Sequence, residues 1–426
     1  MSAAGASEGG DESFRDTAVR LAGVWDRFWF TPRRPHTLCV LRALTGAMLL
    51  YCHVVLAVDL LSFIGRDAWI NNELAGQLHD GAFGISDWAR SYLWLIDNPT
   101  MIWVHHGFTM LVTALFMVGC LTRITLPLAL FLQLMYLHRL TGALFGLDQI
   151  VTYCTIYLAI TPCGSRFSVD SILRRRLEFK RESSAVWRFL LPDDSPSVAA
   201  NIGTRLLQLH LCVIYLFGGL SKARGETWWD GTAVWYAISN YEYQSLDLTW
   251  MSRYPAMISA LSNATLFWEV FYCALIWPKV TRPFVLAVAV AVHGSIALSL
   301  GMATFGTMMI VANGIFLSPT WFQSRDQRQS DEELAADDLD AVDEQAAEQE
   351  RAERAVDEQL QNPDLSDAER ARLREKKEKI RAAADRIKRR YRALKKREKK
   401  YEVRVKKLRE REDKLKTIVK KRRERK

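Results

Sequence analysis

The sequence predicts an all-α polytopic membrane protein, with a bundle of about eight transmembrane helices and a long, charged, cytoplasmic C-terminal helix. Hydrophobic residues make up 49% of the 426 residues and are concentrated between His36 and Trp321. Several apolar runs in this region approach the roughly 20 residues that a helix needs to cross a bilayer. Beyond Trp321 the chain is mostly polar and charged, which predicts a separate tail outside the bilayer.

Eight apolar runs predict the individual spans. They are Leu38–Phe63, Met101–Leu121, Ile124–Phe145, Gln149–Pro162, Ala199–Leu220, Thr265–Trp277, Phe284–Leu300 and Phe305–Phe316. The fourth, sixth and eighth are short for a full crossing. The chain therefore divides into a cytoplasmic N-terminal segment (1–36), a membrane domain (37–320), an acidic linker (321–366) and a basic helix or weak coiled coil (367–426).

Basic residues predict the orientation of the membrane domain. In the N-terminal segment, residues 12–30 repeat apolar side chains at steps of three and four, which is typical of an amphipathic helix on the membrane surface. Arg33 and Arg34 then precede the first span, whereas the long loops Arg66–Asn98 and Ala223–Ala264 hold few bases for their length. Because basic loops favour the cytoplasm, we expect the N- and C-termini of this multi-pass protein to be cytoplasmic.

Cysteine usage and the missing motifs exclude several function classes. The seven cysteines lie within or at the ends of apolar runs, in odd number and without metal-ligand spacing, so we expect small buried hydrophobes and neither disulfides nor a metal site. The polar N-terminus has no small-residue cleavage site, which predicts a retained first anchor. Without a phosphate-binding loop, nucleophile elbow or zinc-hydrolase motif, nothing supports a hydrolase or a nucleotide-driven machine.

Lys222 is the main candidate for chemistry. It lies three and four residues after Gly219 and Gly218, and helical side chains lean toward the N-terminus, so its stem should cover bare backbone beside room for a ligand. Burial favours the uncharged amine, which is the form that a general base needs. The alternative is that Lys222 reaches the outer interface and only marks the end of its helix.

Other polar residues fall within the predicted spans. Counted from the cytoplasmic anchors at about 1.5 Å per residue, Glu269, His293 and His53 lie near the midplane. Glu269 and His293 are expected to pair, either as a structural hydrogen bond between spans or as a proton relay under a quinone-sized cavity. His138 and Asp148 flank a turn at the outer level of Lys222 and are further catalytic candidates.

Tryptophans gather near the predicted outer ends of the spans. Trp228 and Trp229 belong first to an interfacial aromatic belt. A second interpretation is a flat apolar ring site, in which these two tryptophans, Gly218 and Gly219 contact a bound cofactor.

Three motifs occur in the order HRLTGALFGLDQIVTYCTIYLAITPCGSRFSVD, YLFGGLSKARGETWWDGTAVWY and WEVFYCALIWPKVTRPFVLAVAVAVHG. Over residues 37–320 the chain resembles the membrane domain of the vitamin K-dependent gamma-carboxylase-like (HTTM) family. The resemblance implies that Lys222 deprotonates a reduced vitamin K or menaquinone, whose reaction with oxygen gives an epoxide and a strong base. In true carboxylases that base removes a glutamate γ-proton before carbon dioxide adds. The eukaryotic enzyme carries a large extramembrane domain after its spans, whereas the charged helix of this chain is expected on the opposite, cytoplasmic side, so the chain is more similar to bacterial members of the family.

The tail carries two opposite charge blocks. Residues 331–368 hold fifteen acids and two bases, and residues 369–426 hold thirty bases and ten acids. Ser366 and Glu369 have capping-box spacing, which predicts a helix from about Asp367, and apolar residues then recur every seven positions from Leu373 to Leu415. The basic part is expected to bind anionic lipid, an acidic partner or the acidic block itself, and its heptads allow a homo-oligomer. Nucleic acid ranks below these partners, because only the charge supports it and the tail has no recognised nucleic-acid-binding module.

Two functions remain open. The first is a quinol-using membrane oxygenase related to the carboxylases, with Lys222 as base and Glu269 and His293 in support. The second is a non-enzymatic membrane scaffold or lipid-binding protein that recruits a partner through its basic helix.

Overall fold

The computed structural model describes residues 17, 21–79, 91–140, 142–322, 345, 347–362, 366–384, 387 and 395. They fall into two compact units, Met1–Phe322 and Gln323–Lys426. The described parts of both units form helices and turns without a β-sheet, and one isolated antiparallel bridge joins Arg33 to Ser197. The all-α prediction is therefore confirmed.

Eight apolar helices of more than ten residues occur in the described part of the first unit. They are α2 (His36–Val58), α5 (Pro99–Val118), α6 (Thr122–Arg139), α7 (Gly146–Ala159), α11 (Val198–Ala223), α14 (Pro255–Leu275), α15 (Arg282–Ser299) and α16 (Ala303–Asn313). Shorter helices connect them: α3 (Leu60–Ile64), α4 (Asn72–His79), α8 (Val169–Arg176), α9 (Glu178–Ser183), α10 (Ala185–Leu190), α12 (Glu226–Trp229) and α13 (Ala233–Ile238). The 3₁₀ turns are η1 (Tyr92–Leu95), η2 (Thr249–Arg253), η3 (Gly314–Phe316) and η4 (Pro319–Phe322).

Five of the described helices, α2, α5, α11, α14 and α15, are long and apolar enough to cross a membrane. The other three apolar helices are shorter or less apolar. The helix α14 differs most from expectation, since it begins at Pro255, ten residues before the predicted span. The polar residues that obscured this start are satisfied by their own helix: Ser262 Oγ donates to the Ile258 carbonyl and Asn263 Nδ2 to the Ser259 carbonyl.

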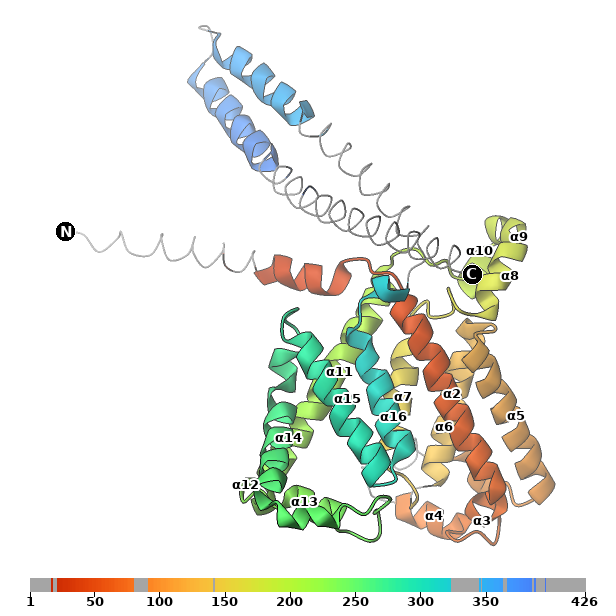
Figure 1. The fold of residues 1–426 in the computed structure, drawn as a ribbon. Coiled ribbons are helices and arrows are strands. Elements are labelled where there is room, and N and C mark those ends of the chain that lie inside the picture. The colour runs from red at the N-terminus through yellow and green to blue at the C-terminus, as the bar shows by residue number, and fades with distance from the viewer. Residues whose placement is uncertain are drawn as a thin grey trace, which may run out of the picture. The chain divides into compact units, whose positions relative to one another are not determined.

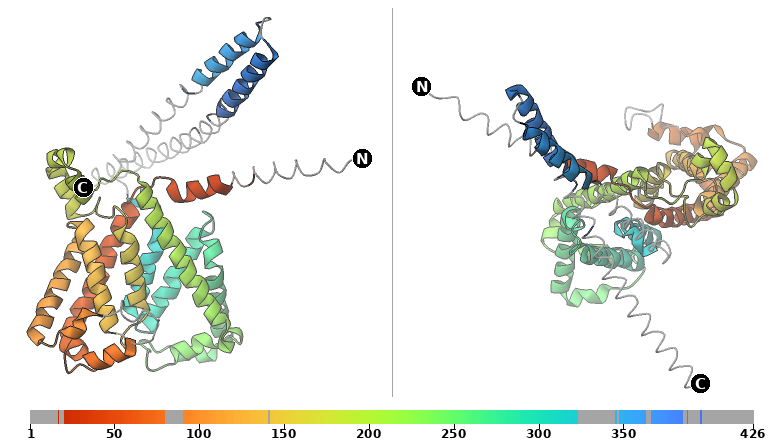
Figure 2. Two further views of the ribbon diagram at one scale, coloured as in Figure 1. Left: turned by 180° about the vertical axis from the view of Figure 1, so that it is seen from behind. Right: turned by 90° about the horizontal axis from the view of Figure 1, so that it is seen from above.

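The long helices run up and down side by side in two groups, α11, α14 and α15 on one side and α2, α5 and α6 on the other, with α7 and α16 between them (Figure 1). The helices α5 and α14 lie at opposite ends of the bundle (Figure 1). The view from behind and the view along the helices show the same order (Figure 2). One continuous core joins the groups, from Leu38 and Phe116 to Tyr272 and Met308. The N-terminal end of α2 and the C-terminal end of α16 lie at the same end of the bundle (Figure 1).

Local signals fix where the helices begin and end. Asn98 Oδ1 accepts hydrogen bonds from the backbone of Thr100 and Met101 at the start of α5, and Gly119, with φ +73°, ends that helix in the left-handed region. Asp170 of α8 caps the start of α6, because its carboxylate accepts from the backbone N–H groups of Leu121 and Thr122. These caps remove unsatisfied N–H groups that hydrocarbon could not solvate.

Arg42 anchors the bundle at the end where α2 begins. Its side chain is fully buried and donates to the carbonyls of Phe116, Met117, Cys163 and Phe167. These acceptors come from the end of α5 and from the loop before α8. The charge is thus satisfied by a ring of carbonyl oxygens and holds three segments together.

Large apolar side chains also cover the outer faces of the long helices. Exposed examples are Val54 on α2, Phe108 on α5, Phe217 on α11, Phe271 on α14 and Phe284 on α15. Exposed apolar side chains on the outer faces of long apolar helices are of the kind that lipid tails solvate. Together with the helix lengths, it is consistent with a multi-pass membrane domain.

Helix 21–30 docks against the end of α11. Asn201 Nδ2 donates to the carbonyls of Phe28 and Trp29, each at 2.8 Å. Leu21 and Trp25 are exposed on the free face. The predicted amphipathic helix is present over these residues, whereas most of residues 12–20 lie outside the described part.

All seven cysteines are free. Cys39, Cys154, Cys163 and Cys212 are buried, and the other three are half-buried. They pack as small hydrophobes among the helices, as the sequence predicts.

The second unit contains a helix hairpin. Helices 347–360 and 367–384 run antiparallel, because Lys377 pairs with Asp357 and Arg381 Nε lies 2.6 Å from Glu353 Oε1. Val356 is buried between them. The predicted capping box is present, since Ser366 N donates to Glu369 Oε2 at 3.0 Å and Glu369 N donates to Ser366 Oγ at 3.4 Å. Apart from residues 387 and 395, the chain beyond 384, with most of the heptad row, lies outside the described residues.

Candidate functional site

A cavity of about 650 Å³ lies among α11, α13, α14, α15 and α16. Its walls are mainly apolar, with Ile214, Leu261, Val288, Val292, Phe305 and Met309 among them. The polar groups at its edge include Lys222, Glu269, Tyr215 and His293, and Trp228 also contributes to the wall. An apolar space with a few convergent polar groups is the usual form of a small-molecule site.

Lys222 and Glu269 form an ion pair at this cavity, with Nζ 2.8 Å from Oε2. The helices α11 and α14 are antiparallel, and each side chain leans toward the N-terminus of its own helix, so the two side chains converge. The Lys222 side chain is 31% exposed and that of Glu269 is 11% exposed. The ammonium also lies 5.6 Å from the centre of the Trp228 ring, within cation–π range.

The two glycines that precede Lys222 have different roles. A Cβ on Gly219 would lie 2.8 Å from both the backbone nitrogen and Cγ2 of Val270, so this glycine allows α11 and α14 to approach closely. A Cβ on Gly218 would meet only Glu269 Oε2 at 3.5 Å and Lys222 Nζ at 3.9 Å. Gly218 therefore keeps open the space beside the ion pair, as the spacing predicts.

His293 belongs to a directional hydrogen-bond chain. Tyr272 Oη donates to Asn313 Oδ1 at 2.6 Å, Asn313 Nδ2 donates to Tyr215 Oη at 2.7 Å, and Tyr215 Oη lies 2.8 Å from His293 Nε2. Because the Tyr215 oxygen accepts from Asn313, we assign its proton to the bond with Nε2 and the imidazole proton to Nδ1. All four side chains are buried.

This geometry corrects the expected Glu269–His293 pair. Both residues line the same cavity, in agreement with their similar predicted depth. Their partners differ from the prediction, because Glu269 pairs with Lys222 and His293 with Tyr215. Sequence reasoning missed Tyr215, Tyr272 and Asn313. The sequence could have indicated Tyr215, because it lies seven residues before Lys222 and therefore on the same face of α11.

Three further predicted residues lie away from the cavity. Asp148 caps α7 by accepting from the backbone of Phe145 at 2.9 Å, and His138 lies in the last turn of α6. Trp229 is 59% exposed and donates from Nε1 to the Ala223 carbonyl. Of the two adjacent tryptophans, only Trp228 lines the cavity.

A second polar cluster joins α2, α5 and α6. The Tyr136 hydroxyl lies 3.1 Å from His105 Nδ1 and 2.9 Å from His106 Nδ1. His106 Nε2 lies 2.9 Å from the His53 carbonyl. Within the described residues no group of three His, Cys, Asp or Glu side chains is arranged to hold a metal.

Comparison with known proteins adds no further assignment. No family model matches this chain, and neither the curated proteins nor the solved structures contain a match. The arrangement at the cavity can exchange a proton between an amine and a carboxylate and can hold an amphiphile with its polar end beside them.

Proposed function

We propose that this chain is a quinol-binding membrane protein of the carboxylase-like (HTTM) kind, with the Lys222–Glu269 pair as its proton acceptor. The single observation that carries the proposal is this ion pair, at the polar edge of an otherwise apolar cavity. Two of the three sequence motifs that resemble the carboxylase-like family contain Lys222 and Glu269. All eight apolar helices would cross the bilayer, with the arginine-rich end of the bundle and both termini in the cytoplasm.

The cavity residues fit a reduced quinone of the vitamin K or menaquinone type. Such a molecule has a flat ring with two hydroxyl groups and an isoprenoid chain. Trp228 and Phe305 offer aromatic faces for the ring, and the aliphatic walls suit the chain. The hydroxyl groups need polar partners, which Lys222, Glu269 and His293 provide.

The ion pair changes how the base is expected to work. As a pair, Lys222 holds an ammonium and Glu269 a carboxylate, so the available acceptor for a quinol proton is the Glu269 carboxylate. Lys222 then keeps its positive charge beside the site where negative charge develops, which stabilises that charge in a low-dielectric site. Transfer of the Lys222 proton to Glu269 would instead give a neutral amine and acid, and the amine is then the base.

The hydrogen-bond chain behind His293 fixes the imidazole. With Nε2 accepting from Tyr215, His293 Nδ1 is left to donate, and no hydrogen-bond partner for this buried nitrogen occurs among the described residues. We propose that His293 Nδ1 donates to an oxygen of the bound ring. When bound, a reduced quinone would supply two protons and four electrons to each oxygen molecule, two electrons from oxidation of the hydroquinone and two from the ring double bond that becomes the epoxide, so that one oxygen atom enters the epoxide and the other leaves as water.

Binding is tested by filling the cavity. Val292 lines it, whereas Val290 lies two residues away on α15 and is 51% exposed. In lipid nanodiscs, menaquinone should raise the unfolding temperature of the wild type and of Val290→Trp, but not that of Val292→Trp. Equal stabilisation of all three proteins would place the quinone elsewhere and overturn the proposal.

A non-enzymatic lipid-binding protein is the second candidate, and the charged hairpin favours it. Arg372, Arg374 and Lys376 of helix 367–384 are exposed, so an anionic lipid or an acidic partner could contact them. In this alternative the cavity holds a lipid without reaction and the tail recruits the partner. Deletion of residues 331–426 would then remove the biological effect, and a neutral substitution of Lys222 would leave it unchanged.

A further inference from the structure

Three arginines surround the 3₁₀ turn η3 at the end of α16. Arg33 Nη2 donates to the carbonyl of Leu317, which directly follows this turn, at 3.4 Å. Arg205 of α11 reaches the same turn through Gln208. Its Nη1 donates to Gln208 Oε1 at 3.0 Å, and the Gln208 amide donates to the Ile315 carbonyl at 3.3 Å.

Trp277 connects the third arginine, Arg282, to the turn η3. Its ring lies 5.7 Å from that of Phe316 in η3, and its carbonyl accepts a 2.6 Å hydrogen bond from Arg282 Nη2. The Arg205 guanidinium lies 5.9 Å from the Trp277 ring and 4.4 Å from the ring of Phe28. Three positive groups therefore meet around one aromatic and 3₁₀ segment.

No carboxylate of the described residues forms an ion pair with any of these three arginines. Their hydrogen-bond acceptors are backbone carbonyls and one side-chain amide. All three side chains are half-buried. Burial, with the charges of Arg205 and Arg282, lowers the pKa of Arg33 to about 10, so the group stays charged at neutral pH in an unfavourable environment.

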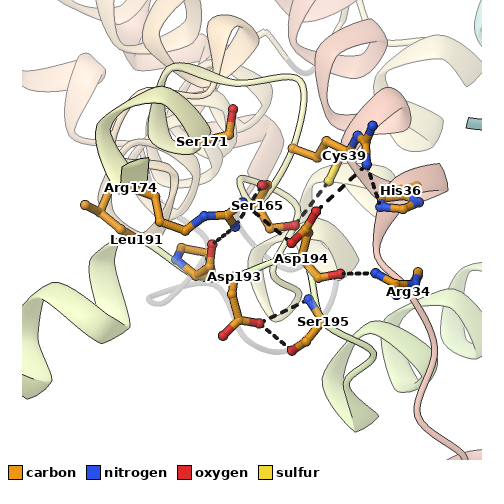
Figure 3. A network of polar contacts seen from close by, with 12 residues as sticks. Arg34, His36, Cys39, Ser165, Ser171, Arg174, Leu191, Asp193, Asp194 and Ser195 are labelled. Carbon is orange, nitrogen blue, oxygen red and sulfur yellow. Dashed lines mark hydrogen bonds and ion pairs between the residues drawn. The ribbon is translucent and has the colours of Figure 1, made fainter. Parts of the chain in front are cut away.

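The adjacent basic cluster has an acid of its own. Arg166 Nη1 and Arg174 Nη2 lie 3.8 and 3.5 Å from the carboxylate of Asp194. Arg34 Nη1 donates to the Asp194 backbone carbonyl (Figure 3). Arg33, the residue directly before Arg34, donates instead to the Leu317 carbonyl in the η3 cluster. Of these two neighbouring basic clusters, only the η3 cluster lacks a paired carboxylate among the described residues.

We infer that Arg33, Arg205 and Arg282 form a binding site for a phosphate group, supplied in the membrane by the headgroup of an anionic lipid. Guanidinium groups bind phosphate oxygens through paired N–H donors, and three of them can offer donors to its several oxygen acceptors. The rings of Phe28 and Trp277 are typical of the headgroup level. The exposed apolar face of helix 21–30 lies next to the site, where acyl chains would be.

The test compares two triple variants of the full chain. Arg33→Gln, Arg205→Gln and Arg282→Gln together remove the site, and Arg175→Gln, Arg176→Gln and Arg188→Gln remove the same charge from exposed residues. Binding of phosphatidylglycerol, measured by native mass spectrometry and by thermal shift at about 0.5 M salt to screen the exposed tail, should weaken at least about tenfold only in the first variant. Arg33→Gln alone removes a single long hydrogen bond and tests the site if the triple variant does not fold.

Inorganic phosphate separates the two sources of the ligand. Stabilisation of the wild type by both phosphate and phosphatidylglycerol, lost in the first triple variant, would support a general phosphate site. Stabilisation by phosphatidylglycerol alone, with phosphatidylcholine inactive, would support a lipid headgroup. Equal lipid and phosphate binding by Arg33→Gln, by both triple variants and by the wild type would overturn the inference.

Discussion

Lys222 Nζ lies 2.8 Å from Glu269 Oε2, and these two atoms are the point at which α11 and α14 meet the cavity. The pair places one exchangeable proton between an amine and a carboxylate in an apolar surrounding. Neither charge would be stable there alone, since an unpaired charge in a low-dielectric region carries a large desolvation penalty. The pair is therefore both a structural contact and the chemical centre of the account.

Removal of one partner should expose that penalty. Lys222→Met or Glu269→Gln should each lower the free energy of unfolding by about 1–4 kcal/mol, because the remaining group, a buried Glu269 or a half-buried Lys222, loses its partner. The double variant should lose less than the sum of the two single losses. Thermal or chemical unfolding in nanodiscs measures this coupling, and strictly additive losses would mean that the two groups do not interact.

The two glycines should respond differently to alanine. Gly219→Ala forces a Cβ to 2.8 Å from Val270, so α11 and α14 must separate, and we expect a loss of about 1–3 kcal/mol. Gly218→Ala makes only ordinary contacts and should be neutral or stabilising by up to about 1 kcal/mol, since alanine favours helix. Equal unfolding temperatures for the two variants would contradict this close helix approach.

Tyr215 should be needed for the position of His293. Tyr215→Phe leaves Asn313 and His293 without their shared hydroxyl, at an expected cost of about 1–3 kcal/mol. The exposed Tyr236→Phe serves as the control. The imidazole nitrogen shifts of His293, measured by solid-state NMR, should also show a changed tautomer balance in Tyr215→Phe, and an unchanged spectrum would argue against the directional chain.

The charged hairpin should depend on a specific antiparallel register. Arg381→Glu should speed amide hydrogen exchange in residues 347–384, because it places two acids together, and adding Glu353→Arg should restore protection. Arg374→Glu makes the same charge change at an exposed residue with no observed ion pair and should have a smaller effect. If Arg374→Glu and Arg381→Glu act alike, only total charge matters.

The features that depend on periodic or local sequence patterns could be predicted from the sequence. Apolar runs located the long helices, and the Ser366–Glu369 spacing correctly gave the start of the tail helix. The start of α14 was wrong by ten residues, because Ser262 and Asn263 look like loop residues until their hydrogen bonds to the preceding turn are known.

The site was predicted in part, because sequence distance gives depth but not direction. The rise per residue brought Glu269 and His293 to one level, yet it could not show that Lys222 and Glu269 lean toward each other from antiparallel helices. The Tyr215–Asn313 contact joins residues 98 apart in sequence, and no local pattern predicts such a pair. His138 and Asp148 share the outer level of Lys222 but lie on other helices, away from the cavity.

The most direct measurement is oxygen-dependent epoxide formation from reduced vitamin K or menaquinone by purified protein in lipid nanodiscs. The wild type should form epoxide, as should Lys279→Met, which changes an exposed lysine. Lys222→Met and Glu269→Gln should lose at least about a hundredfold in rate, since each removes part of the proton acceptor. Absence of epoxide from folded wild-type protein with either quinol, or equal rates in all four proteins, would contradict the proposed role of the Lys222–Glu269 pair.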